Sequence, residues 1–213
     1  MVAPSRSHPH LILASQSPRR VALLEQIGIQ ADSITPSDID ETPFKNELPH
    51  ELAKRLATQK AEHSIQILQN SNALPKEYIL LAADTVVGRG RMILPKPTSI
   101  DEARECLMLL SGRAHRVYSS IAIYTYNHKP RQRLVESRVR FKRLSESEIN
   151  DYIASEEWRG KAGGYAIQGL AARFVVQLIG SYSNVVGLPL FETAQLLESA
   201  GYEMRYTLSP IIR

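Results

Sequence analysis

The stretch EYILLAADTVV, residues 77–87, constrains the fold of this chain more than any other. It is apolar almost without interruption and lacks the alternation of a strand with one face in water, so it is typical of a strand covered on both faces. Strands of that kind lie in sheets that have helices packed against them. The run therefore predicts an α/β fold, and the following GRGRM predicts a turn into a short return strand.

Two helical patterns come before this strand in the sequence. The buried strand HLILAS, residues 10–15, leads into a helix from about Pro18 to Ile27, with Ser17 as a candidate N-cap and Gly28 at the C-terminal end. Apolar residues at helical spacing predict a second helix from about Pro49 to Leu68.

The second half of the sequence mixes helix starts with hairpin signals. Capping boxes begin two helices, and the turn NHKP separates two strands of an antiparallel hairpin. Because crossovers and hairpins both occur, we expect a mixed sheet with flanking helices, in one domain over residues 11–213 after a flexible tail of residues 1–10. The expected elements are helices starting at Ser99 and Ser145, strands HRVYSSIAIYTY, LVESRVRFKRL and RFVVQLI, and a helix from Pro189 to Gly201.

Composition limits the compartment and the partners. The chain has 213 residues, is 43% hydrophobic and has one cysteine, Cys106, which suits a reducing compartment and a place in the core. No window approaches the ~18 consecutive apolar residues that a membrane-spanning helix needs. We therefore expect a soluble, cytoplasmic protein with no membrane partner.

A net charge of +4 and a pI near 9.2 favour an anionic partner. The densest basic run, residues 131–143, alternates with apolar residues as a half-exposed strand does. The run lacks the interleaved aromatic residues that stack on bases, since Phe141 is its only aromatic residue. This argues against a nucleic-acid partner and for a solvated sheet face.

The segment SQSPRR places Arg19 and Arg20 in the first turn of a predicted helix, where the positive end of the helix dipole disfavours them. An anion would reverse that penalty, and Ser15 and Ser17 add neutral donors, so the turn has the parts of a phosphate cradle. Two exposed arginines on a surface helix remain the equal alternative.

Two further charges stand at apolar positions. Lys60 lies within the apolar stripe of its helix, so its ammonium either points inward or snorkels to water, and snorkelling is favoured unless a pocket lies there. Asp84 interrupts the buried strand, near the C-terminal end that we predict for it. Such a carboxylate can bind a divalent cation or take a proton from water, or it can be a structural aspartate held by backbone donors.

Two loops complete the candidate set. Lys96 is held between Pro95 and Pro97, so its direction is largely predetermined. The segment GKAGGYAIQG combines glycines that allow close approach of a ligand with Lys161 and with Gln168, whose amide can both donate to a base and accept from it. Several cations, one central carboxylate and an amide fit a nucleoside triphosphate better than a duplex.

The ordered motifs LASQSPRR, DIDET, RLATQKA, AADTVV, PKP, LSGRAHRVYS, KAGGYAIQG and GSYSNVVGLPLFET resemble those of the Maf-like nucleoside triphosphate pyrophosphatases. The resemblance covers Leu11 to about Tyr202. It implies a mixed α/β fold similar to inosine triphosphate pyrophosphatases, with two lobes around a cleft. It also implies hydrolysis of a nucleoside triphosphate to the monophosphate and pyrophosphate with a divalent metal, Mg²⁺ or Mn²⁺, and a homodimer.

Position by position, the resemblance makes Asp84 the catalytic aspartate. Our own hypothesis is that the divalent cation lies near Asp84, with Glu41 of DIDET as a second carboxylate at the metal or as a plain loop residue. The resemblance makes Arg19, Thr85 and Gln168 residues of substrate choice. The further substrate-binding residues that it implies are Ser15, Arg20, Lys60, Lys96 and Lys161.

Gln168 in YAIQG looks like the subfamily that acts on dTTP and UTP, with modified pyrimidine nucleotides as further candidates. The subfamily that acts on 7-methyl-GTP typically has a glutamate there, and it is the first alternative. The second alternative is a regulator of cell division that binds nucleic acid and has no enzymatic activity, which only the basic pI supports.

Overall fold

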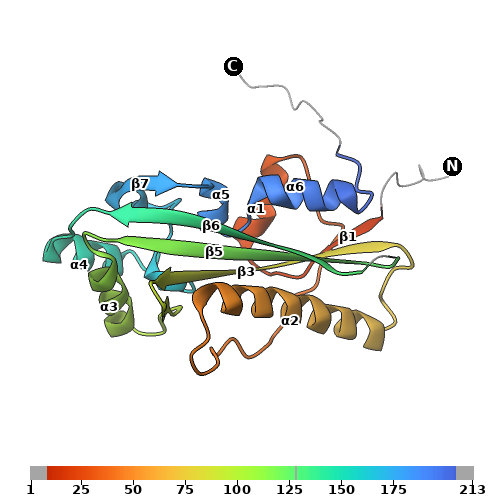
Figure 1. Cartoon of the computed structure of the whole chain (residues 1–213), viewed down its shortest axis with the longest axis horizontal. Coiled ribbons are helices and arrows are strands. Elements are labelled where there is room, and N and C mark those ends of the chain that lie inside the picture. Colours follow the sequence, from red (N-terminus) through yellow and green to blue (C-terminus); the bar gives the residue numbers. More distant parts are fainter. Residues whose placement is uncertain (1–8, 128, 205–213) are drawn as a thin grey trace, which may run out of the picture.

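The structure is a computed structural model that describes residues 9–127 and 129–204. The strands of these residues form one seven-stranded sheet in the order β2-β1-β3-β5-β6-β7, and β4 pairs with β3 (Figure 1). Parallel and antiparallel neighbours both occur, so the expected mixed sheet is confirmed. The strands are β1 (His10–Leu13), β2 (Ser33–Ile34), β3 (Tyr78–Arg89), β4 (Met92–Leu94), β5 (Ala114–Thr125), β6 (Arg131–Phe141) and β7 (Val175–Ile179).

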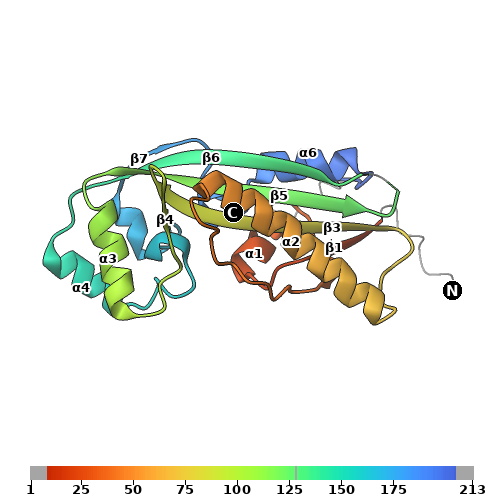
Figure 2. The same ribbon diagram turned by 60° about the horizontal axis from the view of Figure 1, so that its bottom comes forward.

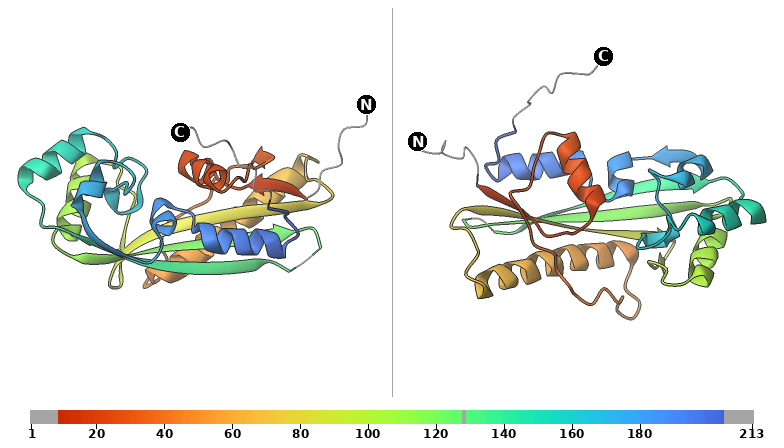
Figure 3. Two further views of the ribbon diagram at one scale, coloured as in Figure 1. Left: turned by 90° about the horizontal axis from the view of Figure 1, so that it is seen from above. Right: turned by 180° about the vertical axis from the view of Figure 1, so that it is seen from behind.

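The helices cover both faces of the sheet. Helix α2 lies on one face, while α1 and α6 lie on the other (Figures 1 and 3). Helices α3 and α4 gather with the 3₁₀ turns at one end of the molecule, away from β1 and α1 (Figure 2). The helices are α1 (Pro18–Gln26), α2 (Pro49–Asn70), α3 (Ile100–Leu110), α4 (Glu146–Ala154), α5 (Tyr182–Val186) and α6 (Leu190–Ser199), with 3₁₀ turns η1 (Ala162–Gly164) and η2 (Leu170–Phe174).

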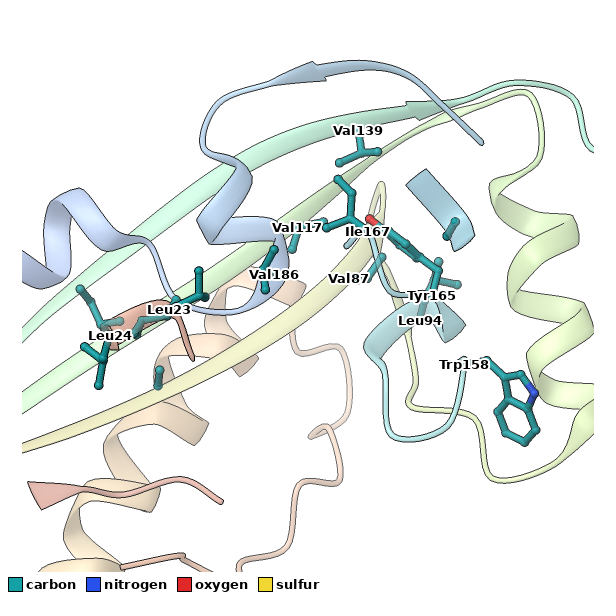
Figure 4. Packing of buried hydrophobic residues seen from close by; sticks show 14 of the residues in the cluster. Leu23, Leu24, Val87, Leu94, Val117, Val139, Trp158, Tyr165, Ile167 and Val186 are labelled. Carbon is teal, nitrogen blue, oxygen red and sulfur yellow. The ribbon is translucent and has the colours of Figure 1, made fainter. Parts of the chain in front are cut away.

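Strand β3 is buried on both faces, as its apolar sequence predicts. Its side chains alternate between two cores, because successive residues of a strand point to opposite sides of the sheet. Leu81 and Ala83 join the large cluster that also contains residues of α1 and α6, whereas Leu80 and Ala82 pack with Ala61 of α2. Figure 4 shows part of the large cluster.

The large cluster continues as an aromatic group into the end of the molecule that carries α3 and α4. Phe174 is fully buried and lies edge-on to Phe141 and Tyr152, with centroid distances of 6.0 and 5.5 Å. Cys106 of α3 is buried as well, and burial, with smaller contributions from two nearby glutamates, raises the pKa of its thiol to about 11. The inference that Cys106 fills the core is confirmed.

Four expectations need correction. Ser17 occupies the N-cap position of α1, but its side chain makes no capping hydrogen bond. Asp84 lies in the middle of β3 and not near its end, because the strand continues to Arg89 to pair with β4 and β5. The strand expected to start at Arg173 begins at Val175. Helix α5 has no counterpart among the expected elements.

The expected tail, residues 1–10, lies outside the described residues except for its last two, and His10 already belongs to β1. The end of the expected domain, residues 205–213, also lies outside them. Among the described residues, no helix combines the length and the apolar character needed to cross a membrane.

Replacing Phe174 by alanine should lower the free energy of unfolding by about 3–5 kcal/mol, because a fully buried ring is lost from the aromatic group. Phe191→Ala is the matched control, since Phe191 is 69% exposed, and its change should stay within about 0.5 kcal/mol. Denaturant titration of both variants measures the difference. Equal losses in the two variants would contradict the packing described here.

Candidate active site

A gap in the edge of β3 creates the candidate site. Strand β1 pairs with β3 at residues 78–81 and β4 pairs with it at residues 87–89, so that no described strand pairs with this edge between them. A pocket of about 520 Å³ lies at the gap. Asp84 and Thr85 both line it although they point to opposite faces of the sheet, because the pocket passes around the open edge.

The structure brings all ten residues singled out by sequence to this one pocket. They come from the β1–α1 turn, α1, the β2–α2 loop, α2, β3, the loop after β4 and the segment after α4. These residues are Ser15, Arg19, Arg20, Glu41, Lys60, Asp84, Thr85, Lys96, Lys161 and Gln168.

A network of two lysines and two carboxylates forms the floor of the pocket. The Nζ atom of Lys60 lies 2.5 Å from Oδ1 of Asp84 and 2.6 Å from Oε1 of Glu41, and Lys96 donates to the other oxygen of Glu41. Lys60 and Asp84 are 8% and 2% exposed. Of the two predicted positions for the Lys60 ammonium, the inward one is observed, because a pocket with two carboxylates lies at this edge of the helix stripe. Asp84 accepts its hydrogen bond from that ammonium and not from the backbone.

The network keeps Glu41 ionised. Burial alone raises the pKa of its carboxyl group, but the ammonium groups of Lys60 and Lys96 outweigh burial and hold the pKa at about 2. Glu41 is thus a charged, partly buried group at the pocket, and not a loop carboxylate that faces only water.

The opposite side of the pocket carries arginines with unused donors. Arg20 donates from Nε to the carbonyl of Gly187 and from Nη1 to Oγ of Ser15, both at 2.9 Å. Arg19 makes no hydrogen bond or ion pair with any described residue. Burial lowers the pKa of both guanidinium groups, and the charge of Arg20 lowers that of Arg19 further. Both arginines are only half-exposed, which disfavours the alternative of plain surface charges and suits an anion.

Thr85 connects β3 to α5 and to Gly187, the residue that follows this helix. Its hydroxyl is 2.8 Å from that of Ser119 on β5, and the Ser119 hydroxyl donates to the carbonyl of Asn184 at 2.9 Å. Thr85 also lies 3.4 Å from the carbonyl of Gly187, the group that binds Arg20. This chain of contacts fixes the wall that faces the arginines.

Glycines hold the segment that carries Lys161 against β3. The N–H of Gly163 donates to the carbonyl of Pro95 at 2.9 Å and so ties this segment to the loop of Lys96. A Cβ at Gly163 would lie 2.9 Å from Val87, and its φ of +66° also favours glycine. Lys161 donates to the carbonyl of Arg159 at 3.0 Å, and burial followed by the charge of Arg19 lowers the pKa of its ammonium.

Gln168 is exposed and lies on a loop that hydrogen bonds from buried or half-buried side chains hold in place. Each of these hydrogen bonds is 2.8–3.0 Å long and ends on a residue two or three positions away from Gln168 in the sequence. They join His115 to the hydroxyl of Tyr165, the hydroxyl of Tyr152 to the N–H of Ala166, and the carboxylate of Glu157 to the N–H of Leu170. The Gln168 amide is thereby presented to the pocket on a fixed backbone.

Sequence reasoning missed Arg159 and Gly187, which also line the pocket. Arg159 pairs with Glu156 at 2.7 Å and lies 4.5 Å above the ring of Trp158. The one signal for Arg159 in the sequence was its position two residues before Lys161. Gly187 lies within the motif GSYSNVVGLP and acts through its carbonyl, which no side-chain pattern reveals.

Asp84 and Glu41 are the residues that could hold a metal ion. The described residues contain no group of three or more histidine, cysteine or acidic side chains suited to a metal, so the protein alone does not build a complete cage. Two carboxylates fit Mg²⁺ or Mn²⁺, because Mg²⁺ is usually bound through one or two carboxylates together with substrate phosphates and water.

Comparison with known sequences places the chain in a defined group. The family model described as Maf-like protein matches residues 10–200. A protein from Rhodopseudomonas palustris is 57% identical over 198 residues, which cover 93% of this chain and 95% of the relative. A protein from Mesorhizobium japonicum is 59% identical over 194 residues, which cover 91% and 93%. Both relatives are named dTTP/UTP pyrophosphatase.

Solved structures match with lower similarity. A HAM1 protein from Coxiella burnetii is 18% identical, covers 63% of this chain and 73% of its own, and has a TM-score of 0.39. A nucleoside-triphosphatase, dITP/XTP pyrophosphatase, from Mycobacterium abscessus is 15% identical, covers 63% and 74%, and has a TM-score of 0.36.

Replacing Lys60 by methionine should lower the free energy of unfolding by about 3–5 kcal/mol, because it leaves the buried Asp84 carboxylate without its ion pair. Lys96→Met is the control from the same network, and its loss should stay below about 1 kcal/mol because this side chain is 42% exposed. Denaturant titrations at pH 7 measure both values. If Lys96→Met lowers the free energy of unfolding as much as Lys60→Met does, burial does not set the strength of these ion pairs.

Proposed function

The chain belongs to the Maf-like protein family, and from this premise we propose that it is a nucleoside triphosphate pyrophosphatase acting on dTTP and UTP. It releases the monophosphate and pyrophosphate. The observation that carries the proposal is the pocket itself, which six cationic side chains line together with the buried carboxylate of Asp84. A small polyphosphate matches that arrangement because its charge is concentrated in a volume that one pocket can enclose.

The triphosphate is bound by the cations on both sides of the pocket. Arg19 and Arg20 have donors that no described protein group uses, and Ser15 lies beside them. Planar guanidinium groups suit bidentate contacts with phosphate oxygens. The other cations that we assign to the triphosphate are Lys60, Lys96 and Lys161.

Asp84 orients a water molecule for attack on the α-phosphorus and accepts its proton. The bond from the water oxygen to phosphorus forms, the bond from phosphorus to the bridging oxygen breaks, and pyrophosphate leaves with the electron pair of that bond. Asp84 and Glu41 also hold the divalent cation, Mg²⁺ or Mn²⁺. When bound, the cation neutralises charge on the phosphate oxygens.

Substrate choice rests on Gln168, Thr85 and Arg19. An amide can donate to one group on the edge of a pyrimidine and accept from another, which a carboxylate cannot do. Thymine and uracil offer both kinds of group, which suits dTTP and UTP, the substrates in the names of the relatives, with modified pyrimidine nucleotides as further substrates. The homodimer and the cytoplasmic location remain predictions.

The non-enzymatic alternative has less support. Only the basic pI supports it. The densest basic run forms β6, and Arg116 of the neighbouring strand β5 pairs there with Glu136 of β6 at 2.6 Å. A strongly salt-dependent affinity for DNA or RNA without nucleotide turnover would favour this alternative.

Purified protein with Mg²⁺ or Mn²⁺ should release pyrophosphate from dTTP and UTP in preference to other common nucleotides. Asp84→Asn should abolish turnover, since the amide neither accepts the proton nor carries the charge, while circular dichroism keeps the native spectrum. Asp101→Asn, an exposed residue in the first turn of α3, is the control and should keep full activity. Turnover retained in Asp84→Asn would overturn the role of Asp84.

Gln168→Glu should reduce the ratio of kcat/KM for dTTP to that for 7-methyl-GTP by about 10-fold or more, since the amide donor is lost and a carboxylate acceptor for guanine N–H groups is gained. Gln168 is exposed, so the fold should not change. Steady-state kinetics with both nucleotides measure the ratio. An unchanged ratio would remove Gln168 from substrate choice.

A further inference from the structure

We propose that Arg55 is the positioning residue that places the Glu41 carboxylate in the pocket. The inference rests on the proposed function and adds to it a residue that lies outside the pocket. Arg55 is on α2, five residues before Lys60 on the same helix, and is not among the residues that line the pocket.

The segment that carries Glu41 has little regular structure to hold it. Residues 35–48 connect β2 to α2 and form neither helix nor strand. Two hydrogen bonds fix the start of the segment to the sheet and to α2. The N–H of Thr35 donates to the carbonyl of Leu13, and the hydroxyl of Ser64 donates to the carbonyl of Thr35. Because ordering each residue costs about 1–2 kcal/mol of backbone entropy, the rest of the segment needs anchors of its own.

Arg55 supplies those anchors directly after Glu41. Its Nε and Nη2 atoms donate to the two carboxylate oxygens of Glu47 at 2.7 and 2.8 Å. Nη2 also donates to the carbonyl of Thr42 at 3.0 Å, and the guanidinium carbon lies 3.9 Å from the centre of the Phe44 ring. One planar group thus holds three residues of the segment, and the nearest of them is the neighbour of Glu41.

These contacts are stronger than an ordinary surface ion pair. The side chains of Arg55 and Glu47 are only 16% and 8% exposed, and the pair is bidentate. Glu47 also accepts from the N–H of Phe44 at 2.9 Å, and Asn46 adopts a φ of +64°, so the chain closes a tight turn around the carboxylate. The turn is therefore built around the group that Arg55 binds.

Helix α2 consequently controls Glu41 from two sides. Lys60 binds its carboxylate within the pocket, and Arg55 fixes the backbone that follows it. Arg55 and Lys60 stand on one helix, so α2 fixes the distance between the contacts of Arg55, which we call the clamp, and the pocket. None of the hydrogen bonds of Arg55 is with a residue that lines the pocket, so by direct contact Arg55 acts on the pocket through Glu41. Its positive charge also interacts with Asp84, and a lysine at position 55 keeps that charge.

The test is a double-mutant cycle on dTTP hydrolysis. Arg55→Lys keeps the charge but loses the planar fork, so it cannot hold Glu47 and Thr42 together. It should lower kcat/KM about 10-fold in the wild-type background and less than about 2-fold in Glu41→Gln, because a misplaced carboxylate matters only where that carboxylate exists. Equal losses in the two backgrounds would overturn the proposal.

A second measurement does not depend on turnover. Hydrogen exchange followed by mass spectrometry should show faster exchange over residues 38–47 in Arg55→Lys, with the exchange of β3 unchanged. Unchanged exchange of the segment would also overturn the proposal. Lys54→Gln, an exposed position on the same helix, is the matched control and should alter neither exchange nor kcat/KM.

Glu47→Gln provides a route if Arg55→Lys does not fold, because it weakens the same clamp from the other side and keeps the shape of the side chain. It should give the same coupling with Glu41→Gln and the same faster exchange. Wild-type protein that hydrolyses no nucleotide would refute the proposed function, whereas exchange would still decide whether Arg55 holds the segment.

Discussion

The contact between Lys60 and Asp84 is the interaction on which the site depends. It joins α2 to the central strand, and it allows a charged residue to stand in a strand that is buried on both faces. An isolated carboxylate at 2% exposure would cost several kcal/mol, and the ammonium at 2.5 Å offsets that cost. The position of α2 on the sheet therefore fixes the position of the Asp84 carboxylate.

The charges of the pocket are divided between its two sides. The carboxylates are already matched by Lys60 and Lys96, while the guanidinium groups of Arg19 and Arg20 are left with donors that no described residue uses. The side chains that line the pocket thus carry an excess of positive charge beside two carboxylates that are paired with lysines. A polyphosphate completes this arrangement, because its oxygens satisfy donors that the protein leaves free.

Several elements could be predicted from sequence because their signals are local. Apolar spacing located α1 and α2, the capping serines located α3 and α4, and the apolar run located β3. Other features could not be predicted, because they depend on neighbours far away in the sequence. The extension of β3 beyond Asp84 is set by its pairing with β4 and β5, and the fate of the Lys60 ammonium is set by Glu41 and Asp84.

The sequence by itself determined which residue types are available and on which kind of element each one stands, because periodicity, caps and turns act over a few residues. It also carried the family resemblance, through motifs in a fixed order. Only the tertiary structure decided that β1 stops at Leu13 and leaves an open edge on β3, that Asp84 and Thr85 meet one pocket from opposite faces, and that Arg55 holds the segment after Glu41. These features arise from packing and strand pairing between distant segments, which no local pattern encodes.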